Sequence, residues 1–206
     1  VSGRRNNMSD AMTDAKTDDR VLPFSVESLD VRGRAAVMGP ALDSMLAQHN
    51  YPVPVSRALG EAVVLTALLG SALKFEGRFQ LQTRSDGPVS MIVVDYEPPQ
   101  ASHEKASMRA YARFDKDKVE AAQTKGAVSP ADMLGKGHLA LTIDHGLNRA
   151  RYQGLVELSG QGFEAAAHEY FLRSEQIPTR IRLAVAESFG AGGATAWRAG
   201  GVMVQF

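Results

Sequence analysis

The sequence contains no cysteine, and its 23 basic side chains (Lys and Arg) balance its 23 acidic ones (Asp and Glu). Without cysteine the chain itself cannot form a disulfide, a thiolate nucleophile or a cysteine zinc site. This absence fits a cytoplasmic protein. A zero net charge gives no long-range field to concentrate nucleic acid or anionic lipid, so we expect neither as a partner. It also removes one barrier to self-association, which favours a homodimer.

Long apolar runs are also absent. The longest candidate, residues 62–69, is short and interrupted by Thr66, whereas a membrane span needs about 20 apolar residues. The first 20 residues have no apolar signal core, and their acidic side chains argue against a transit peptide. We predict a disordered tail over residues 1–20, in which Met8 is a candidate natural start that would make residues 1–7 an addition.

The rest of the chain, residues 21–206, predicts a single α+β domain: a largely antiparallel or mixed β-sheet with helices packed on it. A helix over 55–73 is apolar nearly all round in its second half, which places it in the core. Strands over 78–83 and 89–95 flank the turn residues 85–88, where Gly87 can take a positive φ. Residues 91–94 are apolar in succession, which predicts that both faces of that strand are covered.

The remaining elements follow from periodicity and from proline and glycine breaks. We expect strands over 29–37, 108–114, 138–143, 153–158, 179–186 and 197–206, helices over 41–49 and 163–176, and loops over 97–107 and 115–127. Within the last strand, Gly200 and Gly201 predict a bulge or a close backbone approach, because glycine weakens a strand without such a reason.

Motifs for catalysis or nucleotide binding are few. The segment 135–140 superficially resembles a dinucleotide fingerprint, but a strand follows it where that motif needs a helix. Asp144 and His145, with His138 nearby in sequence, could supply an acid and a base, although a plain turn explains residues 144–146 better. Glu164 and His168 lie one helical turn apart, and we interpret them as an exposed pair rather than a metal site.

Several ordered strings resemble one family. They are 49–54 (HNYPVP), 69–79 (LGSALKFEGRF), 86–88 (DGP), 134–137 (LGKG), 152–154 (YQG), 169–179 (EYFLRSEQIPT) and 199–205 (AGGVMVQ). Together and in this order they resemble the heat shock protein 33 family over about residues 21–206. The string 170–179 is the most specific of them.

The resemblance implies an ATP-independent bacterial chaperone, a holdase that binds unfolding proteins and is activated by oxidation. Family members continue into a mostly helical linker and a zinc domain with four cysteines in C-x-C and C-x-x-C pairs. This chain ends at Phe206 without that region, as a truncated piece, a chain with a remainder elsewhere, or a natural variant without the switch. Zinc and redox sensing therefore belong to the family, and we expect no cofactor, metal or catalytic residue here.

In the family the linker packs on an apolar sheet surface of this domain. Without the linker, such a surface would bind exposed apolar segments of unfolding client proteins or would self-associate. The candidate residues, each equally explained as ordinary core, are Met91, Val93, Trp197, Met203 and Phe206. Two alternatives stay open: an enzyme that uses Asp144, His145 or His138, and a purely structural dimerisation module whose apolar patch a second subunit occupies.

Overall fold

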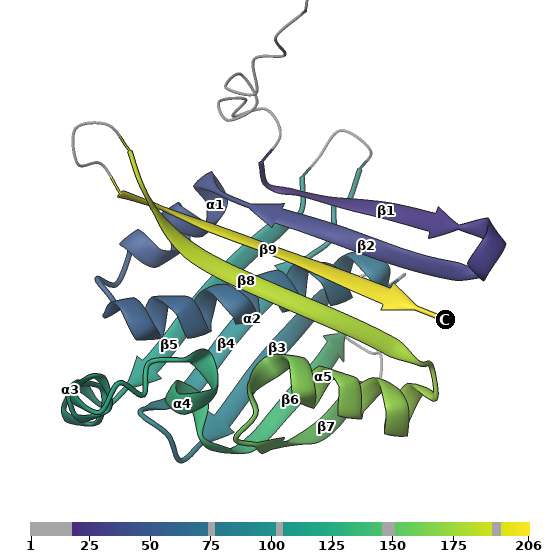
Figure 1. Cartoon of the computed structure of the whole chain (residues 1–206). Coiled ribbons are helices and arrows are strands. Elements are labelled where there is room, and N and C mark those ends of the chain that lie inside the picture. Colours follow the sequence, from purple (N-terminus) through teal and green to yellow (C-terminus); the bar gives the residue numbers. More distant parts are fainter. Residues whose placement is uncertain (1–17, 74–76, 102–104, 146–150, 191–194) are drawn as a thin grey trace, which may run out of the picture.

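The computed structural model describes residues 18–73, 77–101, 105–145, 151–190 and 195–206. These residues form two antiparallel sheets with the longest helix between them (Figure 1). The predicted α+β class with antiparallel strands is confirmed. The strands divide between two sheets, however, where the sequence suggested one, because periodicity marks each strand without showing which strands pair.

Sheet A has the strand order β1-β2-β9-β8. Its strands are β1 (Arg20–Val26), β2 (Val31–Met38), β8 (Thr179–Phe189) and β9 (Thr195–Gln205). The pairing of β2 with β9 joins the two ends of the chain in one sheet. Strand β1 was not predicted, and it begins at the last residue of the expected tail. Just before it, Asp19 accepts hydrogen bonds from the N–H groups of Gly39 (2.8 Å) and Ala41 (3.0 Å).

Sheet B has the order β5-β4-β3-β6-β7. Its strands are β3 (Arg78–Ser85), β4 (Val89–Glu97), β5 (Ser107–Phe114), β6 (Lys136–Asp144) and β7 (Tyr152–Ser159). The predicted hairpin is confirmed as β3 and β4. Gly87 in its turn has no positive φ. A glycine is needed there because a Cβ atom would lie 2.5 Å from the carbonyl oxygens of Met133 and Leu134.

The described residues form five α-helices, of which three match the predictions over 41–49, 55–73 and 163–176. The five are α1 (Pro40–Ala47), α2 (Val53–Ala72), α3 (Lys116–Thr124), α4 (Pro130–Leu134) and α5 (Gly162–Tyr170), with a π-helical turn η2 (Phe171–Glu175) and a 3₁₀ turn η1 (Glu27–Leu29). The predicted loop over 115–127 is wrong, because it contains α3. Asp115 caps this helix by accepting from Lys118 N–H at 3.2 Å, and Lys116 pairs with Glu120 one turn later. Of the predicted loop 97–107, residues 102–104 lie outside the described residues.

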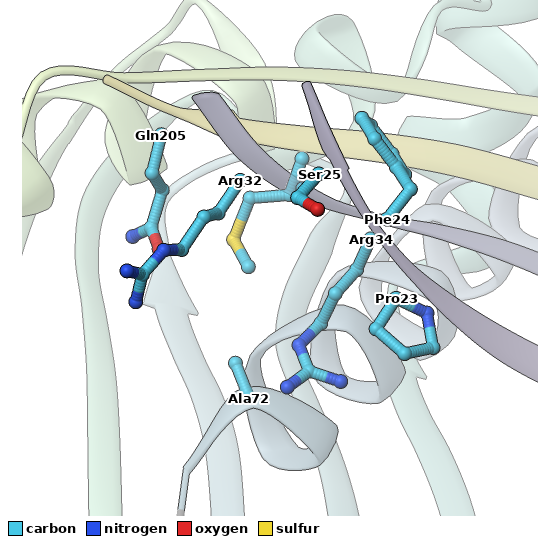
Figure 2. Close-up of a pocket in the computed structure, with 9 residues that line it drawn as sticks. Pro23, Phe24, Ser25, Arg32, Arg34, Ala72 and Gln205 are labelled. Atoms are coloured by element: carbon cyan, nitrogen blue, oxygen red, sulfur yellow. The ribbon is translucent and has the colours of Figure 1, made fainter. Parts of the chain in front are cut away.

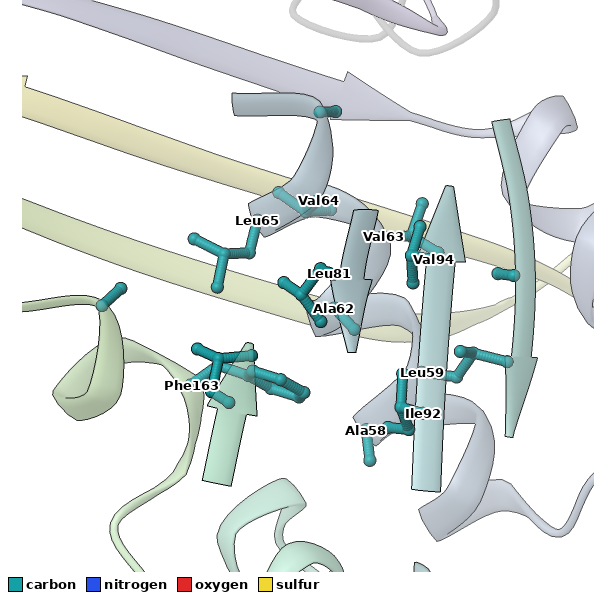
Figure 3. Close-up of a cluster of buried hydrophobic side chains, with 14 of the residues drawn as sticks. Ala58, Leu59, Ala62, Val63, Val64, Leu65, Leu81, Ile92, Val94 and Phe163 are labelled. Carbon is teal, nitrogen blue, oxygen red and sulfur yellow. The ribbon is translucent and has the colours of Figure 1, made fainter. Parts of the chain in front are cut away.

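Helix α2 forms the core of the protein. It packs on sheet B through β4 and on sheet A through β2, β8 and β9. Figure 3 shows its side chains Ala62, Val63 and Leu65 among Leu81, Val94 and Phe163 of the neighbouring elements. By length and composition α2 could cross a membrane, but 83% of its most apolar window is buried inside the protein. That burial marks it as the core helix.

The close approach predicted at the last strand is confirmed for Gly201. A Cβ atom at this position would lie 2.6 Å from Val64 Cγ1 of α2. The register of β9 with β2 and β8 continues through this residue without a bulge. Gly201 thus lets the backbone of sheet A approach the core helix, and it identifies which residues of β9 face inward.

Candidate functional site

The outer face of sheet A, which points away from α2, is accessible and largely apolar over β1, β2 and β9, although Arg20, Arg180, Arg182 and Arg198 lie on the same side near its margins. Since alternate residues of a strand share a face, the pairing register places together a set that we call the apolar face: Leu22, Phe24 and Val26 of β1, Ala35 and Val37 of β2, Val202 and Val204 of β9, and Ala184 and Ala186 of β8. Leu22, Phe24, Val26, Val37 and Val202 are each 38–47% exposed. This exposure shows that no described segment covers them.

Phe24 and Gly33 fit together near the β1 edge of this surface. They are cross-strand partners in β1 and β2, and a Cβ atom on Gly33 would lie 2.3 Å from the ring atom Cζ of Phe24. The phenyl ring therefore lies over the glycine, which leaves Gly33 buried and Phe24 38% exposed. The apolar face keeps an accessible aromatic ring held in place by its own partner strand.

The structure does not bring the five predicted surface residues together. Met91 and Val93 are half-buried on the outer face of sheet B, and Phe206 is 64% exposed just after β9. The prediction for Met203 is wrong. This side chain is only 2% exposed, because Met203 lies two residues from Gly201 and therefore shares the inner face of sheet A with it. Trp197 lies on the same inner face, half-buried against the core.

The outer face of sheet B differs from the apolar face. One cross-strand row contains Tyr111, Val93, Gln82, Ala140 and Leu155, and the rows beside it contain arginines, carboxylates and His138. The prediction that both faces of residues 91–94 are covered is wrong. Ile92 and Val94 are fully buried on α2, whereas Met91 and Val93 remain partly exposed.

Helix α5 carries two polar residues whose role the sequence did not reveal. Glu164 Oε1 accepts a hydrogen bond from Leu183 N–H, and His168 Nε2 accepts one from Ile181 N–H, each at 2.8 Å. The interpretation of these residues as a solvated pair is wrong, because both cap the edge of β8. Burial, and next the positive charge of Arg180, lower the pKa of His168, which keeps its ring neutral and able to accept.

A second carboxylate lies close to Glu164. Burial first, and repulsion by Glu164 second, raise the pKa of Glu61 on α2 to about 7. The nearby Arg57 Nε is buried and has no hydrogen-bond partner among the described residues. Three elements, α2, α5 and β8, therefore meet around polar groups. Glu169 and Arg173, which lie one helical turn apart, form an ion pair nearby.

The geometry gives little support to the alternative of an enzyme that uses Asp144, His145 or His138 as acid and base. Asp144 forms ion pairs with Arg151 at 3.0 Å and Arg78 at 3.9 Å. His138 lies six residues earlier on the same strand, about 20 Å away at the rise of a strand. Asp144 lines an open pocket of about 400 Å³ that includes neither His138 nor His145. Gly146 of the same motif lies outside the described residues.

Two larger cavities lie at the end of α2. Figure 2 shows one of about 470 Å³, in which Arg34 points toward Ala72 near the helix C-terminus, where a positive charge is favourable. The other, about 450 Å³, is lined mainly by apolar side chains such as Leu73, Phe171 and Ile177. At its edge Tyr170 Oη donates to Glu175 Oε1 at 2.6 Å, and burial, then this contact, raises the pKa of Tyr170.

The zinc site implied by the resemblance does not fit these residues. The sequence has no cysteine, and in the described ranges no three His, Asp or Glu side chains come together as a metal-ligand set. Any zinc chemistry of the family therefore depends on residues that this chain does not contain.

Comparison with known proteins agrees with the fold. The family model described as Hsp33 protein matches residues 19–206. A 33 kDa chaperonin of Caulobacter vibrioides is 46% identical over 190 residues, which are 91% of this chain and 60% of that protein. One from Photobacterium profundum is 37% identical over 84% of this chain and 55% of its own length. The chain thus spans about 60% or less of the length of these relatives.

A solved structure supports the fold separately. The crystal structure of the 33 kDa chaperonin (heat shock protein 33 homolog) from Thermotoga maritima matches with a TM-score of 0.69, covering 90% of this chain and 60% of that one at 22% identity. At this identity the likeness establishes the fold alone. The family match from residue 19 to the end, with the 46% identical relative, shows that the chain belongs to the Hsp33 protein family.

Proposed function

We propose that this chain is an ATP-independent holdase that binds apolar segments of unfolding proteins on its apolar face and so prevents their aggregation. The observation that carries this proposal is the accessible apolar surface of sheet A, where five large side chains are 38–47% exposed. Each Å² of apolar surface that a client buries there contributes about 25 cal/mol. Membership in a family whose relatives are called chaperonins supports the same conclusion.

The proposal extends to regulation. The family resemblance implies a linker that covers an apolar sheet surface until oxidation releases it, and the apolar face is the described surface that fits this role. Lack of cysteine leaves the switch itself to residues outside this chain. The cytoplasm is the compartment that we propose for this activity, since a chain without cysteine needs no oxidising environment to fold.

A test compares two valines on the two outer faces. The chain is added, without ATP and under reducing conditions, to an enzyme that unfolds and aggregates on heating, and light scattering is followed. We expect suppression, which Val202→Gln on sheet A should weaken several-fold while Val93→Gln on sheet B leaves it unchanged. If the folded chain suppresses nothing at any excess, the proposal fails. If only Val93→Gln weakens suppression, the binding face is that of sheet B.

A second copy of the chain is the rival occupant of the apolar face. Zero net charge favours self-association, and a permanent dimer through this face would leave no surface for clients. Sedimentation across a dilution series separates the two cases. A holdase binds clients whether or not it dissociates into monomers on dilution. A dimerisation module stays dimeric at all concentrations and suppresses no aggregation.

A further inference from the structure

Several backbone N–H groups at the margins of the two sheets are capped. A strand at an edge has N–H and C=O groups free to pair with another chain, and proteins usually block them. Here Tyr51 Oη accepts from the edge N–H of Ala112 in β5 at 3.0 Å. Asp43 Oδ1 accepts from Trp197 N–H at 2.5 Å, where β9 extends beyond β2. Strand β1 contains Pro23, which has no N–H.

Strand β8 is protected over only half of its length. Glu164 and His168 accept from Leu183 and Ile181, so these N–H groups point away from β9 toward the edge. In an antiparallel ladder the outward groups recur at every second residue. The next two outward N–H groups therefore belong to Val185 and Glu187.

Within the described ranges these two groups have no acceptor. Helix α5 begins at Gly162 and lies along the Thr179 end of β8, away from its Phe189 end (Figure 1). None of the described residues accepts a hydrogen bond from Val185 or Glu187 at the edge. The ladder with β9 nevertheless continues in regular register to Phe189. The segment Val185–Phe189 is thus an ordered strand edge that no described residue blocks.

The open edge is continuous with the apolar face. Ala184, Ala186 and Ser188 of β8 point to the outer side and are exposed. Their side chains are small, so larger side chains of an added strand could lie beside them without obstruction. Such a strand would lie beside Ala184 and Ala186, whose partners on β9 are Gly200 and Arg198, and Val202 lies one row further along the same face.

We propose that Val185–Phe189 pairs, main chain to main chain, with an extended apolar segment of an unfolding client, whose side chains then extend over the apolar face. This inference rests on the proposed holdase function and adds a second source of affinity. Main-chain hydrogen bonds do not depend on side-chain identity. The edge would therefore hold clients of varied sequence, with alternating apolar side chains as the shared requirement.

A second copy fits this edge poorly. Since α5 covers β8 up to Leu183, two copies could pair only through their open segments, Val185–Phe189. An antiparallel pairing of the two segments about a two-fold axis places Glu187 opposite Glu187 of the second copy. Like charges directly opposite each other destabilise a sheet. A client segment with a lysine at that place would be attracted instead.

The test uses a labelled peptide of alternating valine and threonine with one central lysine, and its binding is measured by fluorescence anisotropy. The matched control is the same peptide N-methylated at two consecutive central residues, which keeps every side chain but blocks both peptide edges. We expect N-methylation to weaken binding by at least about tenfold, because one of the two methyl groups replaces the N–H that would bond to β8 and also holds the two strands apart.

Two substitutions at one position separate main chain from side chain. Glu187→Pro removes an outward N–H without removing a bond to β9, and should weaken peptide binding about tenfold. Glu187→Gln keeps the N–H and should bind a lysine-free version of the peptide as the unmodified chain does. Thermal unfolding reports whether each variant is folded. The comparison of the parent and N-methylated peptides uses the unmodified chain and so does not depend on any variant.

The outcomes separate this inference from the proposed function. If both peptides bind equally, or the parent peptide does not bind while aggregation is still suppressed, the edge inference is overturned and the holdase proposal stands. If neither peptide nor client binds, the holdase proposal itself fails. If Glu187→Pro converts a dimer into a monomer, the edge belongs to a second copy and the inference is overturned.

Discussion

Sheets A and B pack their inner faces on the same helix, yet their outer faces differ in the share of apolar and charged side chains. The outer face of sheet A presents Leu22, Val37 and Val202, each at least 40% exposed. The outer face of sheet B presents charged groups, among them the Asp95 carboxylate, which lies 3.3 Å from Arg109 and 3.7 Å from Arg78. One face is suited to solvent and the other to contact with another molecule.

This difference shows how one core can support two kinds of surface. A sheet needs only its inner face to fold, so the outer face is free to vary. In sheet B most strands alternate apolar and polar residues, so that many outward side chains interact with water or form ion pairs with one another. In sheet A apolar or small residues predominate on the outer side of β1, β2 and β9, with arginines mainly on β8, and the outer apolar area remains available for a partner.

The largest expected change in the free energy of unfolding comes from placing a larger side chain on the inner face of sheet A. Gly201→Val should lower the free energy of unfolding by about 3 kcal/mol or more, because its Cβ atom would lie 2.6 Å from Val64 Cγ1 and overpack the core. Gly200→Val is the matched control on the outer face, where the nearest atom to a Cβ is Ala36 O at 3.4 Å. We expect it to change stability by under about 1 kcal/mol.

Urea unfolding of the two variants checks this. Normal stability of Gly201→Val with altered client binding would contradict the assignment of Gly201 to the inner face. Equal losses for both variants would mean that the two faces of β9 do not differ as described.

A smaller change, this time a gain in the free energy of unfolding, is expected from a substitution of Glu61, which lies where α2 faces α5. Burial raises the pKa of Glu61 from 4.5 to about 7. The folded state therefore holds this proton more tightly than the unfolded chain does. The stability that it contributes is complete below pH 4.5 and is lost as the pH rises to about 7.

Glu61→Gln should therefore raise the free energy of unfolding at pH 8 by about 2 kcal/mol, less than the full linkage value because the side chain keeps some contact with solvent. At pH 5 it should have little effect. The control Glu157→Gln, on the outer face of sheet B, should change little at either pH. Urea titrations at both pH values measure this, and an equal gain at pH 5 and pH 8 would show that ionisation of Glu61 is not the cause.

The sequence predicted the elements better than their arrangement. Helix α2 and the hairpin of β3 and β4 were predicted because long apolar periodicity and turn residues are local signals. Strand β1 was missed because Pro23 and the adjacent polar tail conceal it, and only pairing with β2 stabilises it. The prediction of a loop over 115–127 overlooked two helix signals that are present in the sequence: the N-cap residue Asp115 and the oppositely charged pair Lys116 and Glu120.

The candidate site was the harder part to predict. Strand β9 is apolar or small on both faces, so alternation could not show that Met203 points inward and Val202 outward. Only the approach of Gly201 to Val64 settles this, and that contact joins residues far apart in sequence. Likewise, Glu164 and His168 formed a recognisable helical pair, but the N–H groups that they cap belong to a strand that follows the helix.

The smallest expected effect concerns the ion pairs of sheet B. Asp95 accepts a hydrogen bond from Gln80 Nε2 at 2.8 Å and interacts with Arg78 and Arg109, whose side chains are 38% and 70% exposed. Because solvent screens such pairs, Asp95→Asn should cost under about 1 kcal/mol of unfolding free energy, and less still in 1 M NaCl.

Suppression of client aggregation by Asp95→Asn should equal that of the unmodified chain, because the substitution leaves sheet A untouched. Urea unfolding at two salt concentrations and the light-scattering assay measure both quantities. A loss above about 2 kcal/mol that persists in high salt would show that the outer face of sheet B is an organised structural surface. Weaker suppression of aggregation would assign that face a part in binding clients, and the contrast between the two sheets would no longer hold.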